Sequence, residues 1–238
     1  MLILAFETTA KAGSVALLED GKLLAESYQN MGLTHSQTLM VMASDMLKAA
    51  GKTVAELTAV AVAEGPGSFT GVRIGVAAAK GLAWGAELPC FGVSTLESMA
   101  RTLGIYQGYV CPVMDARRSQ VYNALFYVNQ GRLERRCQDR AIALSDLAAE
   151  LKDLEGPIFL VGDGSNLTFN TLKDTIPGLI LPPEHRMHQR ASGVALAAAE
   201  KIAVGDSGDG AALTPNYLRL SQAERERMEK LQITNDKL

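Results

Sequence analysis

The sequence predicts an α/β protein made of two similar lobes, each built as βββαβα, and three observations lead to that prediction. An apolar strand opens each half of the chain and ends in a carboxylate, Glu7 in the first half and Asp115 in the second. A glycine turn then joins two further strands, at Gly21 and again at Gly131. A helix and another strand follow in both halves, so one order of elements occurs twice.

In the first half, short apolar or alternating runs indicate strands, and apolar residues spaced three or four apart indicate helices. Thr34 with Gln37, and Ser94 with Glu97, have the spacing of a capping box at a helix start. We expect strands at residues 2–6, 14–19, 22–29, 57–63 and 89–93, and helices at 34–50, 70–86 and 94–103.

The second half repeats this plan with shorter helices. We expect strands at residues 109–114, 120–128, 132–136, 158–161 and 179–181, and helices at 145–154 and 191–204. The first predicted domain is an N-terminal lobe, residues 1–104, which carries the helices expected to dock another subunit. The second is a C-terminal lobe, residues 105–220, whose last helix could pack back onto the first lobe. Residues 221–238 are densely charged and are expected to form a mobile tail.

The composition excludes several classes of protein. A net charge of −3 gives no case for strong nucleic-acid binding by this chain alone. The three cysteines have no metal-site spacing, which favours reduced thiols. No apolar run approaches the roughly 20 residues of a membrane span, and the chain enters a strand at once, without the pattern of a signal peptide. We therefore expect a soluble cytoplasmic protein with no membrane partner.

The helix expected at residues 70–86 is unusually poor in side chains. Each interior glycine costs about 1 kcal/mol of helix stability relative to alanine, so close approach by another element is expected to compensate. That element is either the chain's own sheet or a second protein. We predict a partner interface on this helix and on the methionine-bearing helix at residues 34–50. Its residues are His35, Leu39, Met42, Met46, Gly71, Gly75, Ala78, Ala79 and Leu82.

The two carboxylates at strand ends allow a second type of site. Glu7 and Asp115 could hold a metal-nucleotide between the lobes, because duplicated lobes with a hairpin at each strand bend are the layout of the actin-like ATPases. The alternative is that both carboxylates are structural, since residues 7–11 have too little glycine to wrap a phosphate. On the nucleotide reading, the contacting residues would be Glu7, Thr8, Thr9, Gly13 and Ser14, facing residues 162–164.

No catalytic or metal site is predicted. The three histidines, His35, His185 and His188, do not cluster in a metal-ligand pattern, and no Gly-x-Ser-x-Gly elbow is present. Arg117 and Arg118 with Tyr122 form a small basic, partly aromatic spot that either touches RNA phosphate or is a solvated bend.

Several stretches together resemble the bacterial TsaB family. The most specific is residues 65–75, which read Gly-Pro-Gly-Ser-Phe-Thr-Gly-Val-Arg-Ile-Gly. The resemblance continues, in order, almost to the end of the chain, as far as Arg219. Its other parts are residues 2–9, 35–36, 115–118, 121–122, 162–164 and 215–219.

This resemblance implies the two-lobed actin-like ATPase (ASKHA) fold. It implies a non-catalytic subunit that works with the paralogous transferase TsaD and the small ATPase TsaE. The reaction is threonylcarbamoyl transfer to the adenosine beside the anticodon, in tRNAs reading codons that begin with A. It further implies contact with tRNA through the complex, a homodimer when TsaD is missing, and ATP or ADP bound only weakly or at a subunit junction. The alternatives are a small-molecule kinase of the same fold and a metal-dependent peptidase.

Overall fold

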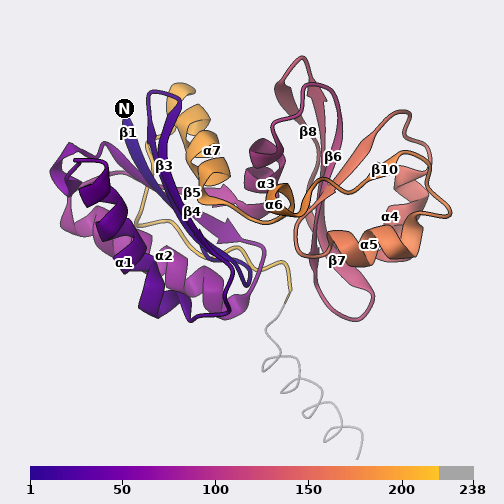
Figure 1. Ribbon diagram of the computed structural model, residues 1–238, viewed down its shortest axis with the longest axis horizontal. Coiled ribbons are helices and arrows are strands. Elements are labelled where there is room, and N and C mark those ends of the chain that lie inside the picture. Colours follow the sequence, from indigo (N-terminus) through magenta and orange to yellow (C-terminus); the bar gives the residue numbers. More distant parts are fainter. Residues whose placement is uncertain (220–238) are drawn as a thin grey trace, which may run out of the picture.

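The computed structural model describes residues 1–219, which form two lobes side by side (Figure 1). Each lobe has one five-stranded mixed sheet, in the orders β3-β2-β1-β4-β5 and β10-β9-β6-β7-β8. Read from the other edge, the second order repeats the first: three antiparallel strands, then two parallel ones. The predicted α/β fold with two duplicated βββαβα lobes is confirmed.

The N-terminal lobe follows the predicted order closely. Its elements are β1 (Leu2–Glu7), β2 (Gly13–Glu19), β3 (Lys22–Gln29), α1 (His35–Ala49), the short 3₁₀ helix η1 (Val54–Glu56), β4 (Ala59–Gly65), α2 (Phe69–Gly85), β5 (Cys90–Ser94) and α3 (Thr95–Leu103). The strand expected to begin at residue 57 begins at Ala59, because η1 and Leu57 form the turn before it.

The C-terminal half contains more structure than its sequence indicated. Its elements are β6 (Gly108–Asp115), β7 (Gln120–Asn129), β8 (Arg132–Ala143), α4 (Leu144–Leu151), β9 (Ile158–Val161), α5 (Ser165–Leu172), β10 (Leu179–Ile180), α6 (Glu184–Met187) and α7 (Ala191–Ala203). Strand β8 runs past residue 136 because it pairs with the full length of β7, from Asn129↔Arg132 to Gln120↔Ala143. Helices α5 and α6 were not predicted.

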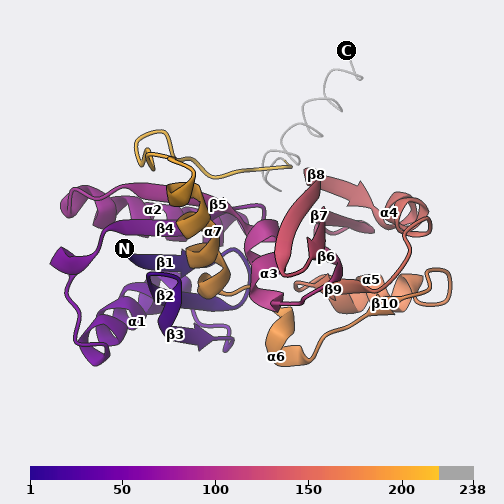
Figure 2. The ribbon, with the colours of Figure 1, turned by 90° about the horizontal axis from the view of Figure 1, so that it is seen from above.

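The N-terminal sheet is covered on both faces. Helices α1 and α2 pack on one face, and α7 packs on the other, where Val194 and Ala198 share a core with Ile3 and Ala5 (Figures 1 and 2). A helix late in the sequence therefore completes the first lobe. The predicted tail at residues 221–238 lies outside the described residues.

Helix α3 lies between the lobes (Figure 2). Its residues Leu96 and Met99 share a core with Val110 and Phe126 of the C-terminal sheet, and its other side packs against α7. Helix α3 therefore packs against elements of both lobes and connects them.

The two predicted capping boxes are wrong in detail. Thr34 precedes α1 but makes no side-chain cap, because the Gln37 N–H donates to the backbone oxygen of Thr34 instead (2.9 Å). Ser94 does accept the N–H of Glu97 (3.2 Å). The Glu97 carboxylate, however, pairs with arginines at 101 and 135 rather than returning to the cap.

Candidate functional site

A cleft of about 720 Å³ lies between the lobes, at the end of the sheets where Glu7 and Asp115 were expected. The N-terminal wall comes from the β1–β2 turn, the start of α1 and the turn before α2. The C-terminal wall comes from the ends of β6 and β9, and the last described residues line the opening. The lining includes Thr9, Lys11, His35, Ser68, Phe69, Asp115, Arg117, Tyr122, Asp163, Asn216, Tyr217 and Arg219.

Glu7 is part of the fold beneath this cleft and does not line it. Its side chain is completely buried, and Oε1 accepts hydrogen bonds from the Thr9 N–H and the Thr9 hydroxyl, both at 2.6 Å. Burial raises the pKa of Glu7 to about 7; the bonds from Thr9 oppose the rise, and the charge of Asp163 adds to it. The second oxygen, Oε2, has no hydrogen-bond partner among residues 1–219.

Most of the predicted phosphate contacts are used inside the protein. The Thr8 hydroxyl donates to the Gly71 carbonyl oxygen (2.8 Å), and the Ser14 hydroxyl accepts the N–H of Ala191 (2.7 Å). Both residues are fully buried. Gly13 is needed because a Cβ there would lie 2.8 Å from Nδ1 of His35. Of the five predicted nucleotide contacts, Thr9 is the one that lines the cleft.

The carboxylates of the second lobe are also held by neighbours. Asp115 accepts the N–H of Arg117 on Oδ1 (2.7 Å). Asp163 lines the cleft and accepts a hydrogen bond from Gln189 Nε2 (3.3 Å), and burial raises its pKa above the ordinary value. These contacts, with those of Glu7, match the structural reading of the two strand-end carboxylates.

The last described residues, 216–219, make contacts with both lobes beside the cleft. The N–H of Asn216 donates to the Glu64 carbonyl oxygen (2.7 Å). The Tyr217 ring stacks on Phe69 with 4.6 Å between centroids, and its hydroxyl accepts Nε–H of Arg73 (2.8 Å). Arg219 reaches the other lobe and donates to the carbonyl oxygen of residue 116. We did not predict these cleft residues individually; the only signal was their place inside the family-like stretches.

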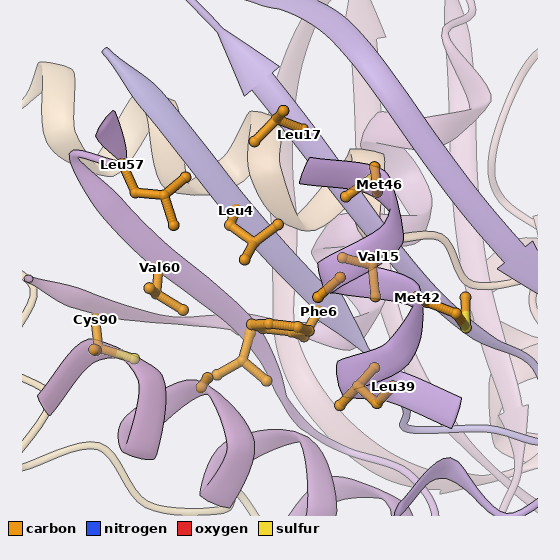
Figure 3. Packing of buried hydrophobic residues seen from close by; sticks show 14 of the residues in the cluster. Leu4, Phe6, Val15, Leu17, Leu39, Met42, Met46, Leu57, Val60 and Cys90 are labelled. Carbon is orange, nitrogen blue, oxygen red and sulfur yellow. The ribbon is translucent and has the colours of Figure 1, made fainter. Parts of the chain in front are cut away.

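The predicted partner interface needs a correction on α1. Leu39, Met42 and Met46 point into the core of the N-terminal lobe, toward Phe6 and Val15 of the sheet (Figure 3). Each is less than a tenth exposed. They are core residues because they follow the inward stripe of an amphipathic helix. His35 is half-buried, with Nε2 lying 2.8 Å from the carbonyl oxygen of residue 10.

The same correction applies to the first part of α2. A Cβ on Gly71 would lie 2.1 Å from the Thr8 carbonyl oxygen, and one on Gly75 would lie 2.3 Å from the Thr8 hydroxyl. Ala79 is buried in the same direction. Close approach by the chain's own first strand therefore explains these glycines. A larger side chain at Gly75 would collide with Thr8 and is expected to destabilise the lobe.

The rest of α2 is different. Ala78 and Leu82, from the predicted interface, are partly exposed, and no atom of the described chain lies within 4 Å of a Cβ built on Gly81 or Gly85. We call Ile74, Ala77, Ala78, Gly81, Leu82 and Gly85 the outer face of α2. Ile74, Ala78 and Leu82 also pack against the core of the lobe, but the described residues do not account for the missing side chains of Gly81 and Gly85.

Among residues 1–219, no group of three or more His, Cys, Asp or Glu side chains is arranged to hold a metal ion. Within the same part of the chain, no helix has the length and apolar character to cross a membrane. His188 lies beside Glu184, with 2.9 Å between Nε2 and Oε1.

Comparison with known proteins gives consistent matches. The family model described as "TsaD: tRNA N6-adenosine threonylcarbamoyltransferase" matches residues 29–226. The tRNA threonylcarbamoyladenosine biosynthesis protein TsaB of Bacillus subtilis is 35% identical over 227 residues, covering 94% of this chain and 96% of that protein. TsaB of Escherichia coli is 34% identical over 222 residues, covering 92% and 95%.

Solved structures agree with the sequence relatives. YeaZ from Pseudomonas aeruginosa superposes with a TM-score of 0.75 at 27% identity, covering 91% of this chain and 99% of that one. The ethanolamine utilization protein EutJ from Carboxydothermus hydrogenoformans shares the fold alone, with a TM-score of 0.51 at 14% identity. The fold is therefore the predicted two-lobed actin-like type. Given these matches along nearly its whole length, the chain belongs to the TsaB family of tRNA threonylcarbamoyladenosine biosynthesis proteins.

Proposed function

We propose that this chain is a non-catalytic subunit that scaffolds and activates threonylcarbamoyl transfer to N6 of the adenosine beside the anticodon, acting with TsaD and TsaE. The target tRNAs read codons that begin with A. The observation that carries the proposal is the similarity to B. subtilis TsaB, which spans 96% of that protein. The match to the TsaD model over residues 29–226 supports a shared ancestry with the transferase itself.

The non-catalytic role is supported by how the reactive groups near the cleft are used. The Glu7 carboxyl is buried under Thr9, and the hydroxyls of Thr8 and Ser14 bond to the backbone of α2 and α7. Nε2 of His35 contacts a backbone oxygen. Acid–base or metal chemistry needs such groups facing a substrate, and here they hold the fold together. The same contacts weaken the small-molecule kinase alternative, which needs free phosphate-binding loops on both lobes.

TsaD is proposed to dock on α1 and the outer face of α2. Helix α1 packs beside α2 and exposes Met40 and Val41, which are 45% and 57% exposed. Exposed apolar residues beside exposed glycines allow a partner helix to approach the backbone closely and to bury apolar surface. The predicted contacts that stay accessible are His35, Ala78 and Leu82. The same surface would serve a homodimer when TsaD is absent.

The test is reconstituted modification of tRNA. TsaD, TsaE, threonylcarbamoyl-adenylate and a target tRNA are combined with or without this chain, and modified adenosine is measured by mass spectrometry. We expect modification only when this chain and TsaD are both present. Equal modification without the chain, or modification by the chain alone, would contradict the proposal. Calorimetry with ATP and magnesium is the companion measurement, because tight binding by the isolated chain would favour a kinase.

A further inference from the structure

The cleft has an aromatic and cationic lining that the proposed scaffold role does not use. It combines three aromatic side chains with three cationic ones, contributed by both lobes and by the last described residues. These residues are Phe69, Tyr122, Tyr217, Lys11, Arg117 and Arg219.

The aromatic groups form a stacking platform. The Arg73 guanidinium lies 3.9 Å from the Phe69 ring centroid and 5.7 Å from the Tyr217 ring centroid, and Phe69 stacks on Tyr217, so the three groups form one compact cluster. Tyr217 is 39% exposed. Tyr122 lines the cleft from the other lobe and is also partly exposed. Aromatic faces of this kind stack on nucleobases of any identity.

The cations are gathered although the whole chain carries a net charge of −3. Lys11 is exposed in the β1–β2 turn. Arg117 lies in a left-handed turn with φ of 62°, which directs the chain back at the end of β6. Arg219, the last described residue, also lines the cleft. Of the two carboxylates in the wall, Asp115 accepts the Arg117 N–H on Oδ1, and burial raises the pKa of Asp163, which disfavours its charged form.

The side chains that line the cleft are unlike those of a nucleoside triphosphate site. Such a site needs hydroxyls or backbone N–H groups around several phosphates and a carboxylate toward magnesium. Here Thr8 and Ser14 are committed to the fold and Glu7 is buried beneath the lining. Separate cations with aromatic faces between them instead suit the spaced phosphates and unstacked bases of a single strand.

We propose that this cleft binds a single-stranded segment of RNA directly, with phosphates at Lys11, Arg117 and Arg219 and a base stacked on Tyr217. The proposal rests on the proposed function, in which tRNA is the substrate of the complex. Stacking on an aromatic side chain requires a base that is not already paired and stacked in a duplex. We therefore expect the bound strand to be an unpaired loop.

Fluorescence anisotropy of the full chain tests this with two labelled RNAs: an anticodon stem-loop, and a blunt duplex of the same length. Lys11→Glu is expected to weaken loop binding about tenfold and to lower the slope of log affinity against log salt. Tyr217→Leu is expected to weaken it about fivefold. Lys22→Glu is the matched control, because Lys22 is exposed at the opposite end of the β2–β3 hairpin. Thermal melting checks that each variant is folded.

The proposal is supported if the loop binds more tightly than the duplex and Lys11→Glu loses affinity while Lys22→Glu does not. It is overturned if no RNA binds, if the duplex binds as well as the loop, or if both lysine variants behave alike. Displacement of the RNA by ATP with magnesium at similar affinity also overturns it, since the site would then take free nucleotide. Reconstituted modification that still requires the chain would leave the scaffold role standing in each of those cases.

Discussion

The two ends of helix α2 carry glycines for different reasons. In the first half, Gly71 and Gly75 lie against Thr8 at the end of β1, where any side chain would collide. In the second half, the structure of residues 1–219 places no atom within 4 Å of a Cβ built on Gly81 or Gly85. Glycine in a helix therefore marks a close approach within the fold at one end. At the other end, Gly81 and Gly85 lower the stability of the helix relative to alanine, and no contact of residues 1–219 compensates at those positions.

We infer from this difference that the first half of α2 stabilises the fold, whereas the second half serves assembly with a partner protein. The first half joins β1 to α2 through Thr8, whose hydroxyl donates to the Gly71 carbonyl oxygen. The outer face of the second half is the region that we assign to TsaD. Substitutions on the two halves should then have opposite effects on the free energy of unfolding.

The largest expected effect is that of Gly71→Ala. Its Cβ would lie 2.1 Å from a backbone oxygen, which cannot move without shifting β1. Overpacking a well-packed core costs roughly 1–3 kcal/mol, and we expect the upper end of that range or beyond. Urea denaturation followed by circular dichroism measures it. A free energy of unfolding within about 0.5 kcal/mol of the wild type would mean that the two halves do not differ as described.

The next effect concerns the strand end against which the first half packs. The pKa of Glu7 is raised from 4.5 to about 7 by burial, so the folded chain keeps a proton that the unfolded chain releases between those pH values. The free energy of unfolding should therefore fall as pH rises through this window, by up to about 3 kcal/mol.

Glu7→Gln isolates this contribution, because it keeps the shape of the side chain but does not ionise. The variant should show a flatter dependence of unfolding free energy on pH between 5 and 7.5, and should gain on the wild type above pH 7. Denaturant titrations at several pH values give both curves. Parallel curves for the two proteins would show that Glu7 is not the titrating group.

The smallest effect is that of Gly81→Ala, the counterpart of Gly71→Ala in the second half. The new methyl group meets no atom within 4 Å, and alanine is the better helix former. We expect the free energy of unfolding to rise by about 0.5–1 kcal/mol in the same urea experiment. A loss of stability would mean that Gly81 is held by contacts within the lobe.

The sequence was sufficient for the repeated fold because its signals are local. The turns at Gly21 and Gly131 and the apolar strands identify both lobes without long-range information. It was insufficient for the cleft, since Phe69, Arg73 and Tyr217 meet only after the chain has built the second lobe and returned. Strand β8 was underestimated because its charged edge residues conceal the alternation of a strand.

The partner interface shows the same limit more clearly. Small residues and methionines on two helices indicated close packing, but the sequence alone did not tell which neighbour was close. For Gly75 and Met46 the neighbour is the chain's own sheet. For Gly81, no atom of residues 1–219 lies within 4 Å of where a side chain would begin, and only the three-dimensional arrangement separates the two cases.

The affinity of TsaD for the Gly81→Leu variant tests the assignment of this outer face most directly. Leucine adds bulk where the lobe has free space, so the melting temperature should not fall, while TsaD binding measured by calorimetry should weaken at least about tenfold. Ala203→Leu is the matched control, because Ala203 is exposed at the end of α7 on the other side of the sheet. This variant should bind TsaD normally. Wild-type affinity in the folded Gly81→Leu variant would contradict the account.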